Sequence, residues 1–243
     1  VFLVVATSLQ AQLAEAYVDY YDEDSTQIRS QGVFRNGVEH GEWKFFYKSG
    51  QVQEVANFWD GTRHGTNITY YENGQKEFQG YFKRGYQDSL FNAWYPAGTK
   101  ELTGVFELDV RVGKWLYYYP QGQLRKVEKH KDGIAYTTQY YDSTGKQTVI
   151  EGTGEITKYH ENGEVKEHSE IAGGLRSGKT SYYFDNGSVE AAGSFVSGEL
   201  DGKWEFYGLP SKIARIEHYD SGNLTGSYIE FYPSGDTAIA GVF

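Results

Sequence analysis

Short stretches that mix aromatic and polar residues recur along the chain, and each one runs into a turn closed by glycine. Residues 113–122 (GKWLYYYPQG) show the pattern most clearly: a glycine opens the stretch, four aromatic residues follow, and a glycine ends it. The length of these stretches and their β-favouring residues predict short strands. No helix longer than a turn or two is expected outside the first residues.

The pattern repeats with a period of 24 residues. The turn glycines are Gly50, Gly74, Gly98 and Gly122, and later Gly163, Gly187 and Gly235. The opening glycines lie nine positions earlier, at Gly41, Gly65, Gly113, Gly154, Gly178, Gly202 and Gly226. Eight positions after the turn glycine comes an aromatic residue, at Phe34, Phe58, Phe82, Phe106, Phe195, Tyr219 and Phe243. Three marks with one period identify a tandem repeat of about nine units.

The period is broken once, near residues 145–154. The turn glycine Gly145 is followed by the opening glycine Gly154 after nine residues, where the repeat elsewhere has fifteen. One return strand and its turn are therefore shortened. We expect the sheet to kink or to change its curvature at this point.

Each unit reads as a β-hairpin followed by a second turn. Asn73-Gly74 and Asn186-Gly187 follow aromatic residues, and Asn-Gly is the preferred pair for a type I′ turn. A second turn follows each repeat Phe, as in Asn36-Gly37 and Asp60-Gly61. Strand, turn, strand and turn then alternate, which predicts an all-β, elongated, single-layer antiparallel sheet of tandem hairpins.

One repeat position is aromatic in eight units and is expected to form a ladder along the sheet, as a structural or binding face. Its members are Phe46, Tyr70, Trp94, Tyr118, Tyr159, Tyr183, Tyr207 and Phe231. A second aromatic set, which includes Trp43, Trp115 and Trp204, lies three residues earlier in each strand and should point to the opposite face. Rings on both faces suit a single layer in which each ring covers its neighbours.

Composition supports this architecture and narrows the function. The 243 residues include 22 Tyr, 14 Phe, 5 Trp and 30 Gly, but only 39% are hydrophobic. The formal net charge of −10 disfavours nucleic acid as a partner, and also binding to anionic membrane lipid. The chain has no Cys, so disulfides and thiolate metal sites are excluded.

The chain begins with an apolar segment. Residues 1–12 (VFLVVATSLQAQ) resemble the second half of a secretory signal peptide, which predicts export to the periplasm, the cell surface or the outside of the cell. An ordinary first strand is the alternative. We expect residues 13–31 to be a linker or an N-terminal cap, and residues 32–243 to be the repeat domain.

The repeat resembles the MORN repeat, in the bacterial variant found in proteins labelled YwqK-family antitoxins. Residues 41–50 (GEWKFFYKSG) and 202–207 (GKWEFY) carry the likeness best. The resemblance implies a twisted antiparallel sheet of hairpins that acts as a scaffold, a dimerisation surface or a lipid-binding element. Catalysis in that family belongs to separate domains.

We find no catalytic, cofactor-binding or metal-binding constellation in the sequence, and we expect a non-catalytic protein. His160, His168 and the nearby Glu161, Glu164 and Glu167 have no known ligand spacing, and a solvated hairpin explains them better. The acidic run at residues 19–24 lacks the glycine and the bidentate Glu of a calcium loop. No phosphate-binding or nucleophile motif is present.

Three functions remain open. The first is a scaffold that binds another protein through exposed edges and a long aromatic face. The second is a module that binds carbohydrate or cell wall by stacking rings on sugar faces. The third is an antitoxin-like partner of a toxin protein. Exposed Trp and Tyr on one face with flanking polar groups would favour sugar, whereas a large apolar edge or end would favour a protein partner. The identity of that partner is not encoded in any motif we recognise.

Overall fold

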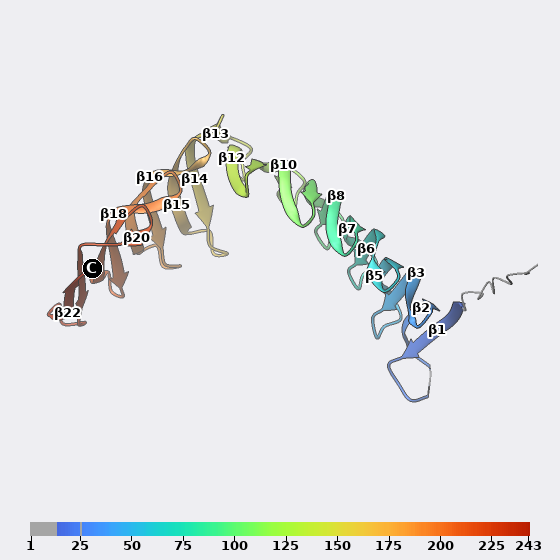
Figure 1. Ribbon diagram of the computed structural model, residues 1–243. Coiled ribbons are helices and arrows are strands. Elements are labelled where there is room, and N and C mark those ends of the chain that lie inside the picture. Colours follow the sequence, from blue (N-terminus) through green and yellow to red (C-terminus); the bar gives the residue numbers. More distant parts are fainter. Residues whose placement is uncertain (1–13, 25) are drawn as a thin grey trace, which may run out of the picture. The chain divides into compact units, whose positions relative to one another are not determined.

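The computed structural model describes residues 14–24 and 26–243, and all regular structure in this part of the chain is β. Its 22 strands hydrogen-bond into one antiparallel sheet (Figure 1), which confirms the predicted single layer of hairpin repeats. The chain divides into two compact units. Unit 1 runs to Val112 and includes residues 120–122; unit 2 comprises residues 113–119 and 123–243.

The strands follow one another along the chain in antiparallel pairs. The first nine are β1 (Ala14–Tyr20), β2 (Ile28–Arg35), β3 (Val38–Phe46), β4 (Val52–Trp59), β5 (Thr62–Arg63), β6 (Gly65–Tyr70), β7 (Lys76–Lys83), β8 (Tyr86–Trp94) and β9 (Lys100–Glu107). The next are β10 (Val110–Tyr118), β11 (Leu124–Lys131), β12 (Ile134–Tyr141), β13 (Gln147–Ile150), β14 (Thr153–Tyr159), β15 (Val165–Ala172) and β16 (Leu175–Tyr183). The last are β17 (Val189–Val196), β18 (Glu199–Gly208), β19 (Lys212–Asp220), β20 (Asn223–Leu224), β21 (Ser227–Phe231) and β22 (Thr237–Val242).

The type I′ turns lie at the opposite end of the strands from the one predicted. They follow the repeat Phe: Asn36 and Gly37 have φ of 53° and 80°, and the same pair of positive φ values recurs at Asp60 and Gly61. A type I′ turn needs positive φ at both central residues. The prediction of such turns at Asn73-Gly74 and Asn186-Gly187 is wrong, because only the glycine of each pair has a positive φ.

The turns that contain the period glycines are longer and include a bulge. Gly50 N donates to Tyr47 O at 2.9 Å, Tyr47 N donates to Gln51 O at 2.8 Å, and Gly50 has φ of 84°. The strand register shifts at the same place, between Phe45 and Phe46. This is the geometry of a type I turn followed by a glycine bulge.

Asparagine is favoured in these turns for its side chain. Asn73 Oδ1 accepts a hydrogen bond from Gln75 N at 3.0 Å, and its Nδ2 donates to Pro96 O at 2.8 Å in the next hairpin. Asn162 makes the same two bonds, with Glu164 N and with Asp185 O. One side chain therefore closes its own turn and binds the neighbouring turn.

Successive hairpins are also joined at both ends of the strands by bonds that repeat with the sequence. At the bulge end, Tyr47 Oη donates to Tyr70 O and Tyr71 Oη donates to Trp94 O, both at 2.8 Å. At the type I′ end, the turn glycines of adjacent hairpins bond in series, as when Gly85 N donates to Arg63 O at 2.8 Å. These bonds fix the stacking of hairpins along each unit.

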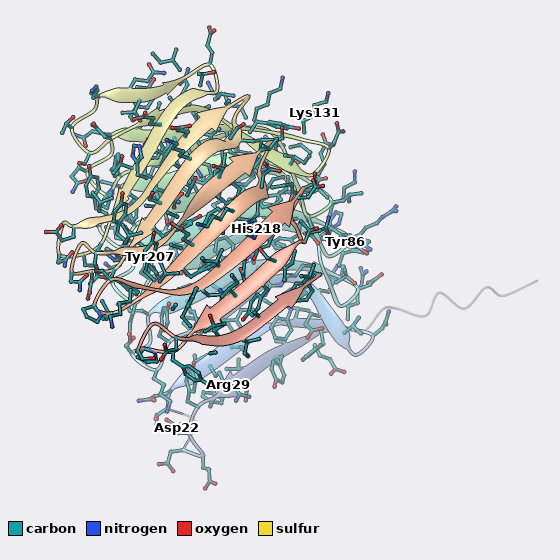
Figure 2. All side chains as sticks on the ribbon, turned by 90° about the vertical axis from the view of Figure 1, so that its left-hand side faces the viewer. Asp22, Arg29, Tyr86, Lys131, Tyr207 and His218 are labelled. Carbon is teal, nitrogen blue, oxygen red and sulfur yellow. The ribbon has the colours of Figure 1, made fainter. Side chains whose placement is uncertain are left out.

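The most deeply buried rings are tryptophans. Trp43, Trp115 and Trp204 are 3%, 0% and 2% exposed. Each indole of Trp43 and Trp204 lies over a glycine of the preceding strand, Gly32 and Gly193, where a Cβ would come within 2.3 Å of a ring carbon. Figure 2 shows the strands of unit 2 side by side, with their side chains as sticks. The core is thus a row of rings against one face of the sheet, closed by glycine on the strand before it.

The first residues of the chain are covered only in part. The predicted signal peptide, residues 1–12, lies outside the described residues. Within the segment expected to be a linker or cap, β1 pairs antiparallel with β2, from Ala14 opposite Arg35 to Tyr20 opposite Ile28. The part of the chain that the structure describes contains no helix that could cross a membrane.

Candidate functional site

The predicted aromatic ladder occupies one equivalent backbone position in eight hairpins. All eight residues stand at the register shift that precedes the bulged turn: Phe46, Tyr70, Trp94, Tyr118, Tyr159, Tyr183, Tyr207 and Phe231. Tyr159 is 54% exposed and the other seven are half-buried. Their shared environment supports the repeat, and their role as a binding face remains a prediction.

A cavity of about 990 Å³ lies in unit 2, at the break in the repeat. At the shortened hairpin of β13 and β14, the turn between β15 and β16 lies against the middle of β12. Gly152 N donates to Thr138 O at 3.0 Å, Gly174 N donates to Gly152 O at 2.9 Å, and Thr137 N donates to Gly174 O at 2.8 Å. As a result, residues of β11 and of β16 line the same cavity.

Glycine is required where these segments meet. Gly152 has φ of 79° and Gly174 has φ of 82°, values that side chains disfavour. A Cβ on Gly152 would lie 2.8 Å from Gly174 N, and one on Gly174 would lie 2.9 Å from the Cβ of Tyr136. The close approach that shapes the cavity therefore depends on this pair.

The base of the cavity is apolar and is aliphatic where the other hairpins carry rings. Tyr140, Val149, Ile156 and Ile171 form a buried cluster, each at most 7% exposed. Ile156 stands at the position that Trp43, Trp115 and Trp204 occupy in their hairpins. Tyr140, Ile156 and Ile171 line the cavity directly.

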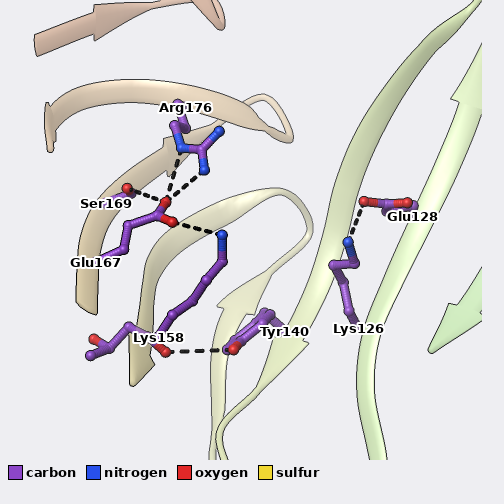
Figure 3. A network of polar contacts seen from close by, with 8 residues as sticks. Lys126, Glu128, Tyr140, Lys158, Glu167, Ser169 and Arg176 are labelled. Atoms are coloured by element: carbon purple, nitrogen blue, oxygen red, sulfur yellow. Dashed lines mark hydrogen bonds and ion pairs between the residues drawn. The ribbon is translucent and has the colours of Figure 1, made fainter. Parts of the chain in front are cut away.

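One wall of the cavity is built around the buried carboxylate of Glu167 on β15 (Figure 3). Its Oε1 accepts from Arg176 Nη2 at 2.6 Å and from Ser169 Oγ at 2.8 Å, and its Oε2 accepts from Lys158 Nζ at 2.7 Å. Burial opposes ionisation of Glu167, but the hydrogen bonds from Lys158, Arg176 and Ser169 outweigh it and lower its pKa. Glu167 is thus ionised and holds two cations.

A second carboxylate, Glu128 on β11, forms the facing wall. Its Oε1 accepts from Lys126 Nζ at 2.6 Å, and its Oε2 accepts from Tyr117 Oη at 2.7 Å. His130, which replaces the repeat Phe, lies with Nε2 3.2 Å from the same Oε2. Burial again opposes ionisation, and the bonds from Lys126 and Tyr117 lower the pKa of Glu128 below its usual value.

The cations of these clusters are more exposed than the carboxylates that hold them. The side chain of Glu167 is 7% exposed, against 48% for Lys158 and 37% for Arg176. The side chain of Glu128 is 11% exposed, against 26% for Lys126. Counting Arg125 and Asp142, four cationic side chains and three carboxylates line the cavity. A chain of net charge −10 therefore places a local excess of positive charge over an apolar floor.

The residues weighed as metal ligands do not come together. His160 Nε2 donates to Tyr183 O at 2.8 Å, His168 Nδ1 is hydrogen-bonded with Thr157 Oγ1 at 3.1 Å, and Glu167 is held by its two cations. In the acidic N-terminal run, Asp19 pairs with Arg29, and Asp22 accepts from Thr26 within its own turn. Within residues 14–24 and 26–243, no group of three His, Asp or Glu is placed to hold a metal ion.

Comparison with known families places this geometry in context. Residues 39–60, 63–84, 111–132 and 153–170 match the family described as MORN repeat variant. The chain carries MORN-type repeats. Each matched MORN repeat spans an outgoing and a return strand, and the hairpins outside the four matches, such as that of β18 and β19, keep the same register shift. The cavity lies between the third and fourth matched MORN repeats.

Two solved structures show a weak similarity to this chain. The crystal structure of TcdB2-TccC3-Cdc42 matches at 10% identity and a TM-score of 0.16, and that of TcdB2-TccC3 without the hypervariable C-terminal region matches at 9% and 0.16. Each alignment covers 96% of this chain and 17% of the other. Such low scores carry no information on fold or function. No relative is found among curated proteins.

The cavity residues were not predicted from the sequence as a site. The signal that points to them is the missing residues between the third and fourth MORN repeats. Glu128 stands in register with Trp115, but Glu217 stands in register with Trp204 in the same way, so a glutamate at this position does not mark the cavity. The missing residues do not show which distant strands meet, because that depends on how the hairpins stack.

Proposed function

We propose that this MORN-repeat protein is a non-catalytic scaffold that binds a partner protein. The observation that carries the proposal is a row of exposed apolar side chains in unit 1, at the type I′ end of the hairpins. The row comprises Val38, Trp59, Tyr86, Leu108 and Val110, which are 37%, 57%, 53%, 57% and 51% exposed.

The residues of the row are brought near one another because adjacent type I′ turns are bonded in series, with Thr62 at the equivalent position between Val38 and Tyr86. Gly61 N donates to Glu39 O at 2.9 Å, Gly85 N donates to Arg63 O, and Asp109 N donates to Gln87 O, both at 2.8 Å. Residues that flank successive turns are thereby held side by side. Exposed apolar side chains scattered singly are ordinary, but five of them gathered at successive turns favour an interaction surface.

The composition of the row favours protein over the other ligands considered. Branched aliphatic side chains at Val38, Leu108 and Val110 offer no planar face for a sugar, whereas they suit the apolar centre of a protein interface. Trp59 packs on His40, and the Arg35 guanidinium lies 5.0 Å from the centre of its ring. Tryptophan is a residue type that often anchors protein interfaces. The net charge of −10 opposes both nucleic acid and anionic lipid.

Carbohydrate binding is the second candidate, and the exposed ring of Tyr159 at the rim of the cavity favours it. An antitoxin-like role, as in the YwqK-type bacterial proteins, would be one case of binding a partner protein. We also propose that the protein acts in the cell envelope or outside the cell, on the basis of the apolar residues 1–9. Fractionation of cells that express the gene under its own promoter tests that location.

Photo-crosslinking tests the function directly. The photoreactive residue p-benzoylphenylalanine replaces Tyr86 in the row, and in the matched control it replaces Tyr232, which is 58% exposed in unit 2. The proposal expects one discrete protein adduct from the Tyr86 position and none from the control, and the variant L108S should abolish it. Equal adducts at both positions, or retention of the chain on polysaccharide with no protein adduct, would overturn the proposal in favour of non-specific contact or sugar.

A further inference from the structure

We infer that the cavity between β11 and β16 of unit 2 binds a small organic anion: an apolar body that carries one carboxylate or sulfonate group. This ligand site goes beyond the proposed partner surface, which lies in unit 1. The inference stands on the apolar floor, the arrangement of charge above it and the size of the space.

The floor suits an apolar body. Tyr140 and Ile156 are each 7% exposed and Ile171 is 6% exposed, and all three face the cavity. Ligand sites in proteins are lined mostly by apolar and aromatic side chains, with a few polar groups that fix the orientation. A cavity of about 990 Å³ is large enough for a drug-sized molecule.

The polar groups that line the cavity favour a ligand with a negative charge. Glu167 is saturated by Lys158, Arg176 and Ser169, so its carboxylate has no site left for a cationic ligand. Lys158 uses one of its three N–H donors to bind Glu167. Arg176 binds the same carboxylate through Nε and Nη2, so its Nη1 makes no hydrogen bond to Glu167. The remaining donors are on the more exposed groups, and an entering ligand meets them first.

The positive charge is also held in place before any ligand arrives. Two cations share one carboxylate at Glu167, which leaves this cluster with a net positive charge. Arg125 adds another cation, set against the ring of Tyr119 with its guanidinium 5.8 Å from the ring centre. Donors fixed by a buried counter-ion lose little freedom on binding, so an anion is favoured over a neutral ligand of the same shape.

The test uses 1-anilinonaphthalene-8-sulfonate, a fluorescent anion with an apolar ring system, as the probe for the full chain. We expect saturable binding that dodecanoate displaces, while dodecanol, with the same alkyl chain and no charge, displaces it at least about tenfold less well. Equal displacement by the acid and the alcohol would show apolar adsorption without an anion site and would overturn the inference.

Substitutions locate the site. K158Q keeps Glu167 paired with Arg176 and Ser169, and R125Q leaves both buried carboxylates with their partners, so a folded protein is expected from at least one of them. Each should weaken probe binding about tenfold, because a hydrogen bond to a charged group is lost. The matched control is K203Q, which removes an ion pair with Glu205 outside the cavity and should bind as the unaltered chain does. Unchanged probe affinity in both cavity variants, or an equal loss in the control, would place the probe elsewhere and refute the site.

Discussion

Gly193, like Gly32, leaves no room for an added carbon atom beneath its tryptophan. Trp204 is 2% exposed, and a Cβ built on Gly193 lies 2.3 Å from its Cδ2 and Cε2. Carbon atoms in contact are about 3.5–4.0 Å apart, so Gly193→Ala forces the ring to move by more than about 1 Å. The backbone of Gly193 is not left-handed, so the effect of the methyl group is steric alone.

The loss of unfolding free energy follows from the packing and the hydrogen bond that the displaced ring loses. Over-filling a packed core costs about 1–3 kcal/mol. Moving the indole also breaks the bond from Trp204 Nε1 to Ser194 O, at 3.0 Å, which contributes about 0.5–1.5 kcal/mol. We therefore expect Gly193→Ala to lower the free energy of unfolding by about 2–4 kcal/mol. At an open strand position the same change would be stabilising, because alanine restricts the unfolded chain.

Urea denaturation followed by circular dichroism measures this free energy. The matched control is Gly208→Ala in β18, where the nearest atom to the new Cβ is the Cβ of Ala214 at 3.8 Å, and its effect should stay within about 0.5 kcal/mol. In a Trp204→Ala background the clash is absent, and Gly193→Ala should then cost less than about 0.5 kcal/mol. If the full loss persists without the tryptophan ring, the packing argument is refuted.

Two further predictions concern the buried groups. The pKa of Glu167 is lowered from its ordinary value of 4.5, so its ion pairs stabilise the fold above that pH, and this stabilisation is lost as the pH falls through the lower pKa of the folded state. The difference in unfolding free energy between the unaltered protein and E167Q should therefore shrink below about pH 4.5. A difference that stays constant with pH would contradict the assignment. Trp115→Ala should lower the free energy of unfolding by about 3–5 kcal/mol, and Tyr118→Ala should lower it much less, because Trp115 is 0% exposed while Tyr118 is half-buried. Equal shifts in the melting temperatures of the two variants would show that the tryptophan row is not the core.

The repeat and its hairpins were readable from the sequence because the residues that define them act locally. Glycine permits positive φ at each turn, and aromatic residues cover the strands between. The turn types were not readable from the same residues. Asn-Gly suits a two-residue type I′ turn, yet at Asn73 the loop is longer and the amide closes the turn with Gln75 N and binds Pro96 O of the next hairpin. That second bond belongs to the stacking of hairpins, which a local preference does not contain.

Which of the two aromatic sets is buried was also only partly predictable from the sequence. Alternation along a strand predicts that Trp43 and Phe46 point to opposite faces, but it does not say which set is buried. In the structure Trp43 is 3% exposed, whereas Phe46 is half-buried beside a register shift at which Gln53 of the return strand has no partner strand residue. Trp43 instead folds over the preceding strand, where Gly32 leaves room for its ring. A glycine in the middle of a strand was therefore a sign of the core, in addition to the turn glycines that marked the period.

The cavity exists because one hairpin is too short to continue the regular stacking. In three other hairpins the rings of Trp43, Phe91 and Trp204 fill the space over Gly32, Gly80 and Gly193 of the strand before them. Where β13 and β14 are shortened, the turn at Gly173 and Gly174 reaches back to β12, and ladder bonds that would join adjacent hairpins now join more distant ones. Val149, Ile156 and Ile171 form the buried cluster there with Tyr140, and two buried carboxylates hold cations from β11, β14 and β16. One shortened hairpin in a repeat array can thus leave room for the ligand site that we propose.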